Sequence, residues 1–269
     1  MGRYNFDKIV DRKHTKSLKY DFAVQRGKPA DVLPFWVADM DFEIPSELKQ
    51  VLLDRVNHGI FGYTESDVEY FNILKEWFAN RFNWNIDKKW LVKTPGVVFA
   101  LAMAVRAFTK EGEGVLINQP VYYPFSMVID DNDRNLINVP LIRGEDKYSI
   151  DFEGVERAII EHNVTLFLLC NPHNPVGRVW TEDELKQLGD ICIKYNVIII
   201  SDEIHADFVW DGHKHTVFAD LGKSYAEHCI VCTAPSKSFN IAGLQVSNIF
   251  IPNDSLRRRF VKEIDRAGY

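Results

Sequence analysis

The sequence predicts an α/β protein whose main domain is a mostly parallel sheet with helices on both faces. Five short apolar runs are rich in β-branched residues and bounded by turn residues, as buried strands are. They are "GVLINQP", "TLFLLCNP", "NVIIISDE", "HCIVCTAPS" and "VSNIFIP". A segment with helical spacing lies between two of them, and strand–helix–strand order favours parallel strands covered on both sides. The length of 269 residues suits one large or two ordinary domains.

The other segments are assigned in chain order. A polar, irregular N-terminal arm is predicted for residues 1–45, and a large domain for residues 46–269. "PSELKQVLLDRVNHG" has helical spacing and a glycine stop, and "SDVEYFNILKEWFANRFN" repeats the pattern with aromatic residues on its apolar face. "GVVFALAMAVRAFTKEGEG" is apolar on three sides, which predicts a buried helix. Thr181 and Glu184 form a capping box ahead of another helix, and the chain is expected to end inside a helix, "DSLRRRFVKEIDRAGY".

Composition and charge exclude several classes of function. The chain is 46% hydrophobic and 26% charged, as soluble globular proteins are, and its net charge of -6 argues against nucleic acid as a partner. No apolar run has the length of a membrane span, and the N-terminus has no signal-peptide core, so we expect a cytoplasmic protein without membrane contact. Cys229 and Cys232 fall on a predicted buried strand with their side chains on opposite or offset faces, so we expect no metal site.

Polar side chains follow three consecutive predicted strands. Asn174 follows the first, Asp202 the second and Lys237 the third. Each alone has an ordinary interpretation: a turn former, a strand-end cap and a solvated lysine. Ligands of parallel sheets bind outside the carboxyl ends of the strands, however. An amide, a carboxylate and an amine at that edge fit pyridoxal phosphate chemistry, in which a lysine forms the Schiff base, a carboxylate pairs with the pyridinium nitrogen and a donor holds the ring oxygen.

The phosphate of such a cofactor needs a site of its own. Gly96, Val97 and Val98 begin the predicted buried helix, where free N–H groups and the helix dipole attract an anion. Ser236, beside the lysine, can add a hydroxyl donor. Tyr122 follows another strand and is placed either to stack on the cofactor ring or simply to pack in the core.

Six segments carry a family resemblance. "NPHNPVG", "SDEIH" and "APSKSFNIAG", in that order, resemble the aspartate aminotransferase superfamily of pyridoxal phosphate enzymes (fold type I, class I and II aminotransferases). "YNFDKIVDRKHTKSLKYD", "PFWVADMDF" and "FGYT" are similar to its branch of cystathionine β-lyase-like C–S lyases. The resemblance runs from about residue 4 to the end of the chain and implies an aspartate aminotransferase-like large domain.

The resemblance also implies roles for individual residues. Lys237 would be the Schiff-base lysine, Asp202 the partner of the ring nitrogen and Asn174 the ligand of the ring hydroxyl. Tyr122 would stack on the ring, and Tyr123 would face the substrate and serve as a proton donor. The remaining implied contacts are those of Tyr63 with the phosphate of a second subunit, which implies a homodimer, and of Val37 and Ala38 with the substrate.

Two positions depart from the aminotransferase pattern. His205 stands where aminotransferases usually carry a tyrosine, which alters hydrogen bonding to the ring oxygen. Gln245 stands where many relatives carry an arginine for the phosphate. Both departures fit the lyase branch better.

The resemblance implies a lyase that eliminates a thiol from cystathionine or cysteine-type amino acids to give pyruvate and ammonia. An aminotransferase on the same scaffold and a non-catalytic, regulatory relative are the alternatives. The family's chain continues beyond residue 269 and holds there the arginine that grips the substrate carboxylate. We therefore expect the C-terminal small domain to be largely missing and this chain alone to be poorly active.

Overall fold

The computed structural model describes residues 4–269, so the first three residues of the predicted arm lie outside the described part. The chain divides into two units. The first unit comprises Met1–Thr64 with Pro235–Leu244, and the second comprises Glu65–Ala234 with Gln245–Tyr269. These units divide the chain after Thr64 rather than after residue 45, and the predicted domain boundary stays a prediction.

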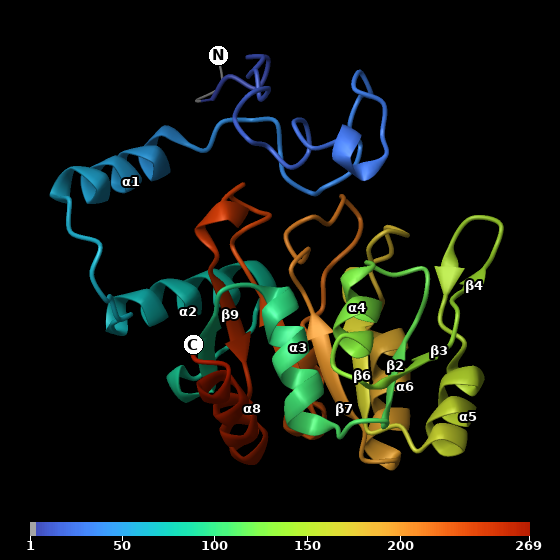
Figure 1. Ribbon diagram of the computed structural model, residues 1–269. Helices are drawn as coiled ribbons and strands as arrows, with labels where there is room; N and C mark the ends of the chain where they lie inside the picture. Colours follow the sequence, from blue (N-terminus) through green and yellow to red (C-terminus); the bar gives the residue numbers. More distant parts are fainter. Residues whose placement is uncertain (1–3) are drawn as a thin grey trace. The chain divides into compact units, whose positions relative to one another are not determined.

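A seven-stranded sheet forms the centre of the second unit (Figure 1). Its strand order is β1-β9-β8-β7-β6-β2-β3. The pairs from β8 through β7, β6 and β2 to β3 are parallel, whereas β9 is antiparallel to both neighbours. The fold class predicted from the sequence is confirmed. The strands are β1 (Leu91–Thr94), β2 (Gly114–Ile117), β3 (Asn135–Asn138), β6 (Leu166–Cys170), β7 (Ile198–Asp202), β8 (Cys229–Thr233) and β9 (Ser247–Phe250).

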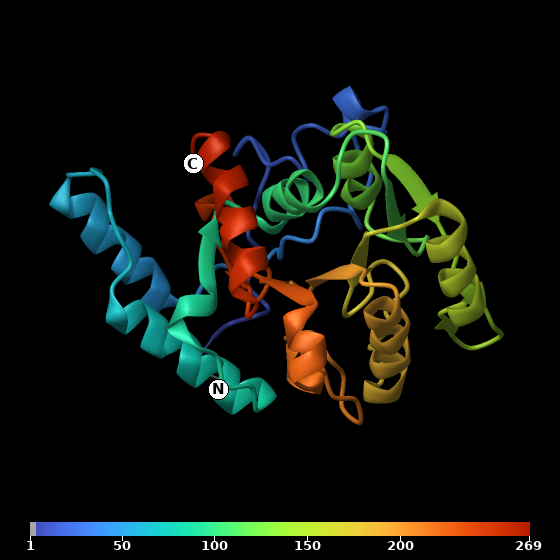
Figure 2. The same ribbon diagram turned by 90° about the horizontal axis from the view of Figure 1, so that it is seen from below.

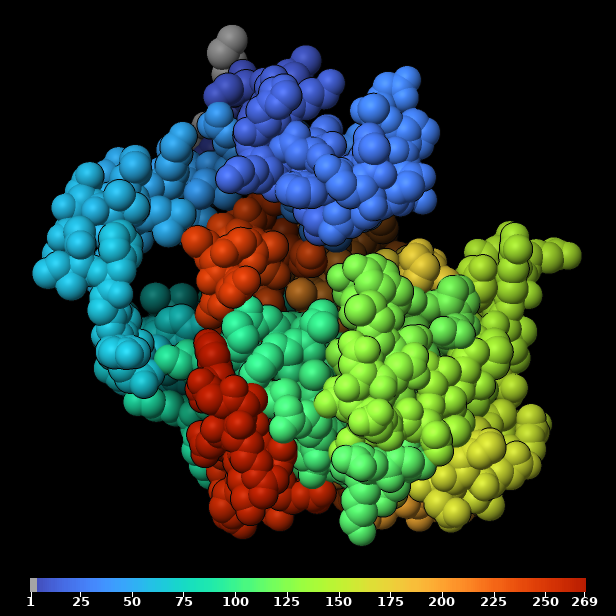
Figure 3. All heavy atoms as spheres, viewed as in Figure 1, coloured from blue at the N-terminus to red at the C-terminus, as the bar shows by residue number. Residues whose placement is uncertain are grey.

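Helices cover both faces of this sheet, as the view from below shows (Figure 2). One face carries α3 (Val97–Phe108), α4 (Pro124–Asp130) and α8 (Asp254–Arg266). The other face carries α2 (Val68–Phe82), α5 (Phe152–His162), α6 (Glu182–Lys194) and α7 (Lys223–Glu227). On the first of these faces α8 lies beside α3 (Figure 3).

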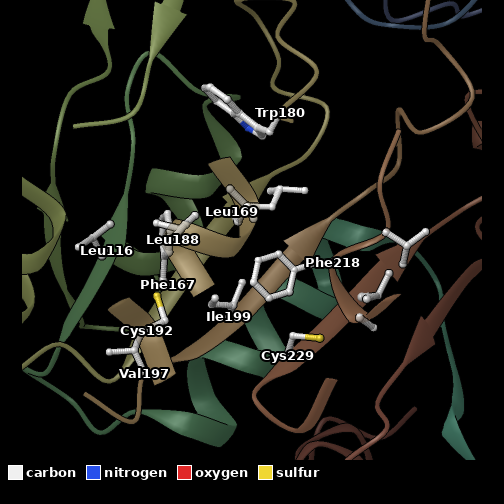
Figure 4. Close-up of a cluster of buried hydrophobic side chains, with 14 of the residues drawn as sticks. Leu116, Phe167, Leu169, Trp180, Leu188, Cys192, Val197, Ile199, Phe218 and Cys229 are labelled. Atoms are coloured by element: carbon white, nitrogen blue, oxygen red, sulfur yellow. The ribbon is translucent and has the colours of Figure 1, made fainter. Parts of the chain in front are cut away.

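The sheet therefore separates two hydrophobic cores. Alternate residues of each strand enter opposite cores because successive strand side chains point to opposite faces. Phe167 and Ile199 belong to the core shown in Figure 4, and Leu168 and Ile200 belong to the other. The two cysteines of the predicted buried strand follow the same rule.

Cys229 lies in the core of Figure 4 and Cys232 in the other core, which confirms that their side chains face opposite ways. Burial raises the pKa of both thiols well above its usual value. Within residues 4–269 no three His, Cys, Asp or Glu side chains are grouped so that they could hold a metal ion.

Local signals place the helix ends. In α6 the Thr181 hydroxyl accepts the Glu184 N–H at 3.2 Å, and the Glu184 carboxylate accepts the Thr181 N–H at 2.8 Å, so the predicted capping box is confirmed. The helix α1 (Ser46–His58) of the first unit ends at Gly59, whose φ of 78° is left-handed.

The prediction that the chain ends inside a helix was wrong. The helix α8 ends at Arg266, because Ala267 caps it and Gly268 has a left-handed φ of 78°. None of the helices within residues 4–269 has the length and apolarity needed to cross a bilayer.

Several short elements were not expected from the sequence. The strands β1 and β3 are four residues long, and β4 (Ile142–Arg143) pairs with β5 (Tyr148–Ser149) in a separate two-stranded sheet. The helix α5 begins after Asp151, whose carboxylate accepts the Gly154 N–H at 2.8 Å. The two-residue strands carry no periodicity, whereas α5 spans eleven residues and its N-cap Asp151 is a local signal from which it could have been predicted.

Candidate active site

The parallel strands β6, β7 and β8 end together. Cys170 of β6 is paired with Asp202 of β7, which is in turn paired with Cys232 of β8. The hydrogen bonding between β6 and β7 continues one residue beyond these pairs, since the Asn171 N–H donates to the Asp202 carbonyl at 2.9 Å. The segments carrying Asn174 and Asp202 therefore start at one edge of the sheet, where ligands of such folds bind.

Asp202 places a carboxylate at this edge with only 5% of its surface exposed. Its Oδ1 accepts the Ile204 N–H at 3.1 Å, which begins the turn after β7. Its negative charge, after burial, is a further cause of the raised pKa of the Cys170 thiol and of the Tyr122 hydroxyl. A carboxylate at the carboxyl end of a parallel strand is suited to pair with the cationic ring nitrogen of pyridoxal phosphate.

The loop that carries Asn174 is fixed by the end of β6. The thiol of Cys170 accepts the Asn174 N–H and donates to the Pro172 carbonyl, both at 3.3 Å. The Trp180 indole N–H donates to the Cys170 carbonyl at 3.0 Å. The peptide bonds before Pro172 and Pro175 are cis. Cys170 therefore orders the backbone from which the Asn174 amide projects.

His173 joins this loop to the loop that follows β2. Its Nε2 donates to the Pro120 carbonyl at 3.0 Å, and its ring lies edge-on to Trp180. Burial lowers the pKa of His173 to about 4, so the ring is neutral at pH 7. The link places the Tyr122 loop beside the Asn174 loop.

Tyr122 is partly exposed, so the structure does not bury it as an ordinary core residue. Burial raises its pKa, with further contributions from Tyr123 and from the charge of Asp202. Tyr123 is 68% exposed, and its ring centre lies 5.2 Å from that of Tyr122. Of the predicted cofactor-binding residues, the structure brings Asn174, Asp202 and Tyr122 together.

The helix α3 begins as predicted, with Gly96 as its N-cap and Val97 as its first residue. It has neither a side-chain cap nor an acidic residue in its first turn. A Cβ added at Gly96 would meet no atom within 4 Å, so the glycine leaves open the space beside the first N–H groups. The Thr94 hydroxyl holds the turn by donating to the Gly96 carbonyl at 3.2 Å. This end of α3, with Val98 half-exposed, fits a phosphate group.

A buried pair behind Asp202 was not found from the sequence. The Glu203 carboxylate accepts Ser201 Oγ and the Phe218 N–H at 2.9 Å and His215 Nε2 at 2.8 Å. These contacts hold both ends of the loop 204–217, which carries the half-buried His205. The available signal was the strand alternation in "SDE": because Asp202 faces one side of the sheet, Ser201 and Glu203 must face the other.

The first unit carries the remaining candidates. Ser236 and Lys237 lie in a loop of tight turns, in which the Phe239 N–H donates to the Pro235 carbonyl and the Ile241 N–H to the Ser236 carbonyl, both at 3.0 Å. Tyr63 is fully exposed. Val37 has a φ of 58°, an unusual conformation for a β-branched residue, and Ala38 beside it is exposed.

A charge network folds the arm around the segment after Ala38. Arg12 donates to the Asp39 carboxylate at 2.6 and 3.2 Å and to that of Asp41 at 2.6 Å. Lys19, only 7% exposed, donates to the Asp39 carbonyl at 3.1 Å. The hydrogen bond with Asp39 is the largest cause of the raised pKa of Arg12, whose charge is therefore fixed. Arg12 and Lys19 belong to the segment "YNFDKIVDRKHTKSLKYD", and Asp39 and Asp41 belong to "PFWVADMDF". Neither segment by itself predicts that the two would pair.

The comparisons with known proteins agree with this fold. The family model described as "Aminotransferase class I and II" matches residues 30–268. The cystathionine β-lyase PatB of Bacillus subtilis is 44% identical, over 98% of this chain and 68% of its own length. The chain thus spans about two thirds of this relative.

Solved structures give the same result. Cystalysin of Treponema denticola, which contains pyridoxal 5'-phosphate, is 42% identical with a TM-score of 0.93, covering 98% of this chain and 67% of that one. The pyridoxal-phosphate-bound C–S lyase of Staphylococcus hominis is 36% identical with a TM-score of 0.90, covering 96% and 66%.

The fold and these comparisons therefore define a pyridoxal-phosphate-dependent protein of fold type I. The chain belongs to the class I and II aminotransferase family and, within it, to the branch of cystathionine β-lyases and C–S lyases.

Proposed function

We propose that this chain forms a C–S β-lyase that eliminates a thiol from cystathionine or a cysteine-type amino acid, giving pyruvate and ammonia. Bound pyridoxal phosphate supplies an electron sink for the bonds at the substrate's α-carbon. The observation that carries the proposal is the buried Asp202 carboxylate at the end of β7, paired in register with β6 and β8. The lyase names of the relatives at 44% and 36% identity support it.

The chain's own residues take separate roles in this proposal. Lys237 would hold the cofactor and its amine would move the α-proton, while Asp202 would keep the ring nitrogen protonated. Asn174 and His205 would bind the ring oxygen, and Tyr122 would contact the ring. The N–H groups of Val97 and Val98 after Gly96 would hold the phosphate, with the Ser236 hydroxyl as a further donor.

The substrate side of the proposed site is assigned to Tyr123, Val37 and Ala38. The exposed Tyr123 hydroxyl donates a proton to the departing sulfur, which makes the thiol a better leaving group. Val37 and Ala38 contact the substrate through the left-handed turn at Val37.

Covalent labelling tests the assignment of Lys237. Purified protein with pyridoxal phosphate is reduced with borohydride, digested and analysed by mass spectrometry. We expect the label on the peptide that contains Lys237, and no label in Lys237→Ala. Label on another lysine, or equal labelling of the variant, would show that the assignment is wrong. Lys223, at the start of α7, provides a matched control, because Lys223→Ala should be labelled like the parent protein.

The reaction itself is tested by its products. With cystathionine or cysteine we expect pyruvate and ammonia in equal amounts. The alternative is an aminotransferase, and the description of the matching family supports this alternative. Transfer of the amino group to an added keto acid, with little pyruvate, would favour that alternative. A protein that binds the cofactor but gives neither product would favour the non-catalytic alternative.

We also propose that the active form is a homodimer. Tyr63 is fully exposed, and the helix α1 buries none of its residues, although Val51, Leu53 and Val56 are large and apolar. Exposed apolar residues in such number mark surfaces that bind a partner. Sedimentation of the full chain, compared with Val56→Lys, is the test: we expect a dimer that the variant weakens. A monomeric parent protein would contradict the proposal.

A further inference from the structure

The side chain of Asn240 joins two parts of the first unit that are 200 residues apart in the sequence. Its Oδ1 accepts the Met40 N–H at 2.9 Å, and its Nδ2 donates to the Met40 carbonyl at 3.1 Å. Nδ2 also donates to the Phe42 carbonyl at 3.0 Å. One carboxamide therefore satisfies both backbone groups of Met40, as a neighbouring β-strand would.

Asn240 is rigid on its own side of this link. It stands three residues after Lys237, and its N–H points to the Lys237 carbonyl at 3.5 Å. Backbone hydrogen bonds within the same loop close the turns around Lys237, with the carbonyls of Pro235 and Ser236 as acceptors. Asn240 itself has a left-handed φ of 55°, which asparagine accepts more readily than most residues. The position therefore requires both an unusual backbone conformation and an amide side chain.

The segment that Asn240 grips is rigid as well. Arg12 and Lys19 hold Asp39 and Asp41 by ion pairs of 2.6 to 3.7 Å. The pKa of Asp41 is lowered, because its bonds with Arg12, Tyr20 and Lys19 together outweigh the effect of burial. The arm thus holds the acidic side chains and also reaches the Met40 carbonyl, to which Arg12 donates at 3.2 Å. Asn240 holds the Met40 N–H and shares in binding the carbonyls of Met40 and Phe42.

The strained residue lies directly before this doubly held segment. Val37 has its left-handed φ of 58°, and the Asp39 N–H donates back to the Val37 carbonyl at 2.9 Å. A β-branched residue keeps such a conformation only where its surroundings enforce it. The hydrogen bonds to Met40, three residues after Val37, are the part of those surroundings that comes from the Lys237 loop.

We propose that Asn240 is a positioning residue: its carboxamide fastens the Lys237 loop to the Val37–Ala38 turn, so that the lysine and the backbone that meets the substrate keep a fixed spacing. This inference rests on the proposed function, which assigns Lys237 to the cofactor and Val37 and Ala38 to the substrate. It assigns Asn240 no contact with either ligand. Loss of the link should therefore weaken substrate binding while the covalent bond between Lys237 and the cofactor still forms.

Two substitutions separate the amide from the backbone. Asn240→Gly keeps the left-handed conformation and removes all three hydrogen bonds. Asn240→Asp keeps the shape and the acceptor for Met40, but places a second oxygen against the carbonyls of Met40 and Phe42. Asn163→Gly is the matched control, because Asn163 is also left-handed, at 47°, but ends α5 in the second unit.

The first measurement needs no cofactor. Hydrogen exchange on the cofactor-free protein should show the Met40 amide losing protection by about tenfold or more in Asn240→Gly, since its hydrogen bond is gone. Asn163→Gly should leave that amide unchanged. Unchanged protection in Asn240→Gly would overturn the link, whatever the enzyme does.

The second measurement uses the loaded enzyme. We expect kcat/KM to fall by about 10- to 100-fold in both Asn240 variants, mainly through KM, because small displacements of groups that position a substrate are costly. Borohydride should still label Lys237 in both. A lower melting temperature with unchanged KM would show a structural role only and overturn the inference. An Asn240→Asp variant as active as the parent would overturn it too.

These outcomes are distinct from failure of the proposed function. If borohydride leaves Lys237 of the parent protein unlabelled, the proposed function is wrong and the positioning role falls with it. If the parent is labelled and active, but Asn240→Gly keeps its KM, only the positioning role is wrong.

Discussion

Glu203 and His215 form a pair that is almost completely removed from solvent, in which His215 Nε2 donates to Glu203 Oε2 at 2.8 Å. Glu203 directly follows Asp202 but points to the opposite side of the sheet, where it also accepts from Ser201 and from the Phe218 backbone. The pair ties the distal end of the loop 204–217 to β7. The pair therefore stabilises, from the opposite face of the sheet, the strand end that carries Asp202.

Glu203→Ala should destabilise the protein by about 3–5 kcal/mol, because it leaves three buried donors without an acceptor. Glu203→Gln keeps one oxygen acceptor and should cost less. Urea unfolding of the two variants measures the difference. Equal loss in both, or no loss in the alanine variant, would contradict this account of the pair.

Asp202→Asn should leave the cofactor bound and lower turnover by about 100-fold or more. An amide cannot compensate the charge of a protonated ring nitrogen, so the electron sink is weakened. Kinetics and cofactor content, measured on the same preparation, check this. Turnover within a few-fold of the parent would mean that Asp202 is a structural strand-end cap, held by its bond to the Ile204 N–H.

Tyr123→Phe should lower pyruvate formation by about 100-fold or more, since positioned proton donors contribute that much. Cofactor binding should persist, because Tyr123 is mostly exposed and Tyr122 remains. The ratio of pyruvate to transferred amino groups is the measurement. An unchanged ratio and rate would show that Tyr123 only lines the wall of the site.

His173 should make the protein less stable as the pH falls below about 6.5. Its pKa of about 4 in the folded chain lies below the usual value of about 6.5, so the unfolded chain binds the extra proton more readily. Stability from this group is therefore complete above pH 6.5 and is lost progressively towards pH 4. At pH 5 the loss is on the order of 2 kcal/mol.

The His173 effect is isolated by comparing two pH values. His173→Gln should be less stable than the parent at pH 7, because it lacks the fit to Pro120 and Trp180. The difference in stability between the parent protein and the variant should be smaller at pH 5, since the variant has no imidazole to protonate. Denaturant midpoints of both proteins at both pH values give this difference, and a constant gap would contradict the prediction.

Gly189→Ala should destabilise the protein by about 1–3 kcal/mol through overpacking in α6. A Cβ there would stand 2.6 Å from the ring of Tyr225 and 3.2 Å from that of Phe218. Gly62→Ala is the control, because a Cβ at Gly62 meets no atom within 4 Å. Thermal melting compares them; equal melting temperatures would show that the Tyr225 ring moves aside at no cost.

Sequence patterns predicted the sheet and its main helices because the relevant signals are local. The apolar runs of β6, β7 and β8 and the capping box of α6 each lie within a few residues. The same locality explains the error at the C-terminus, where helical spacing continues past Arg266 although Gly268, with its left-handed φ, follows the end of the helix.

The candidate site was predicted in part for a related reason. Parallel topology places whatever follows neighbouring strands at one edge, so strand order alone predicted that Asn174 and Asp202 would lie there. The supports of the site were not found, because they join distant segments. Arg12 and Asp39 are 27 residues apart in the sequence, and His173 and Pro120 are 53 residues apart. No local pattern around any of these residues predicts which residue it will contact.

The contact between Asn240 and Met40 also sets an order of events during synthesis. Ribosomes add about 5–20 residues per second, so the 200 residues between the two take about 10–40 s to make. Throughout that interval Arg12 and Lys19 can already meet Asp39, Asp41 and the Met40 carbonyl, but the Met40 N–H lacks its final partner. The arm, although made first, is therefore among the last parts of the chain to reach its native contacts.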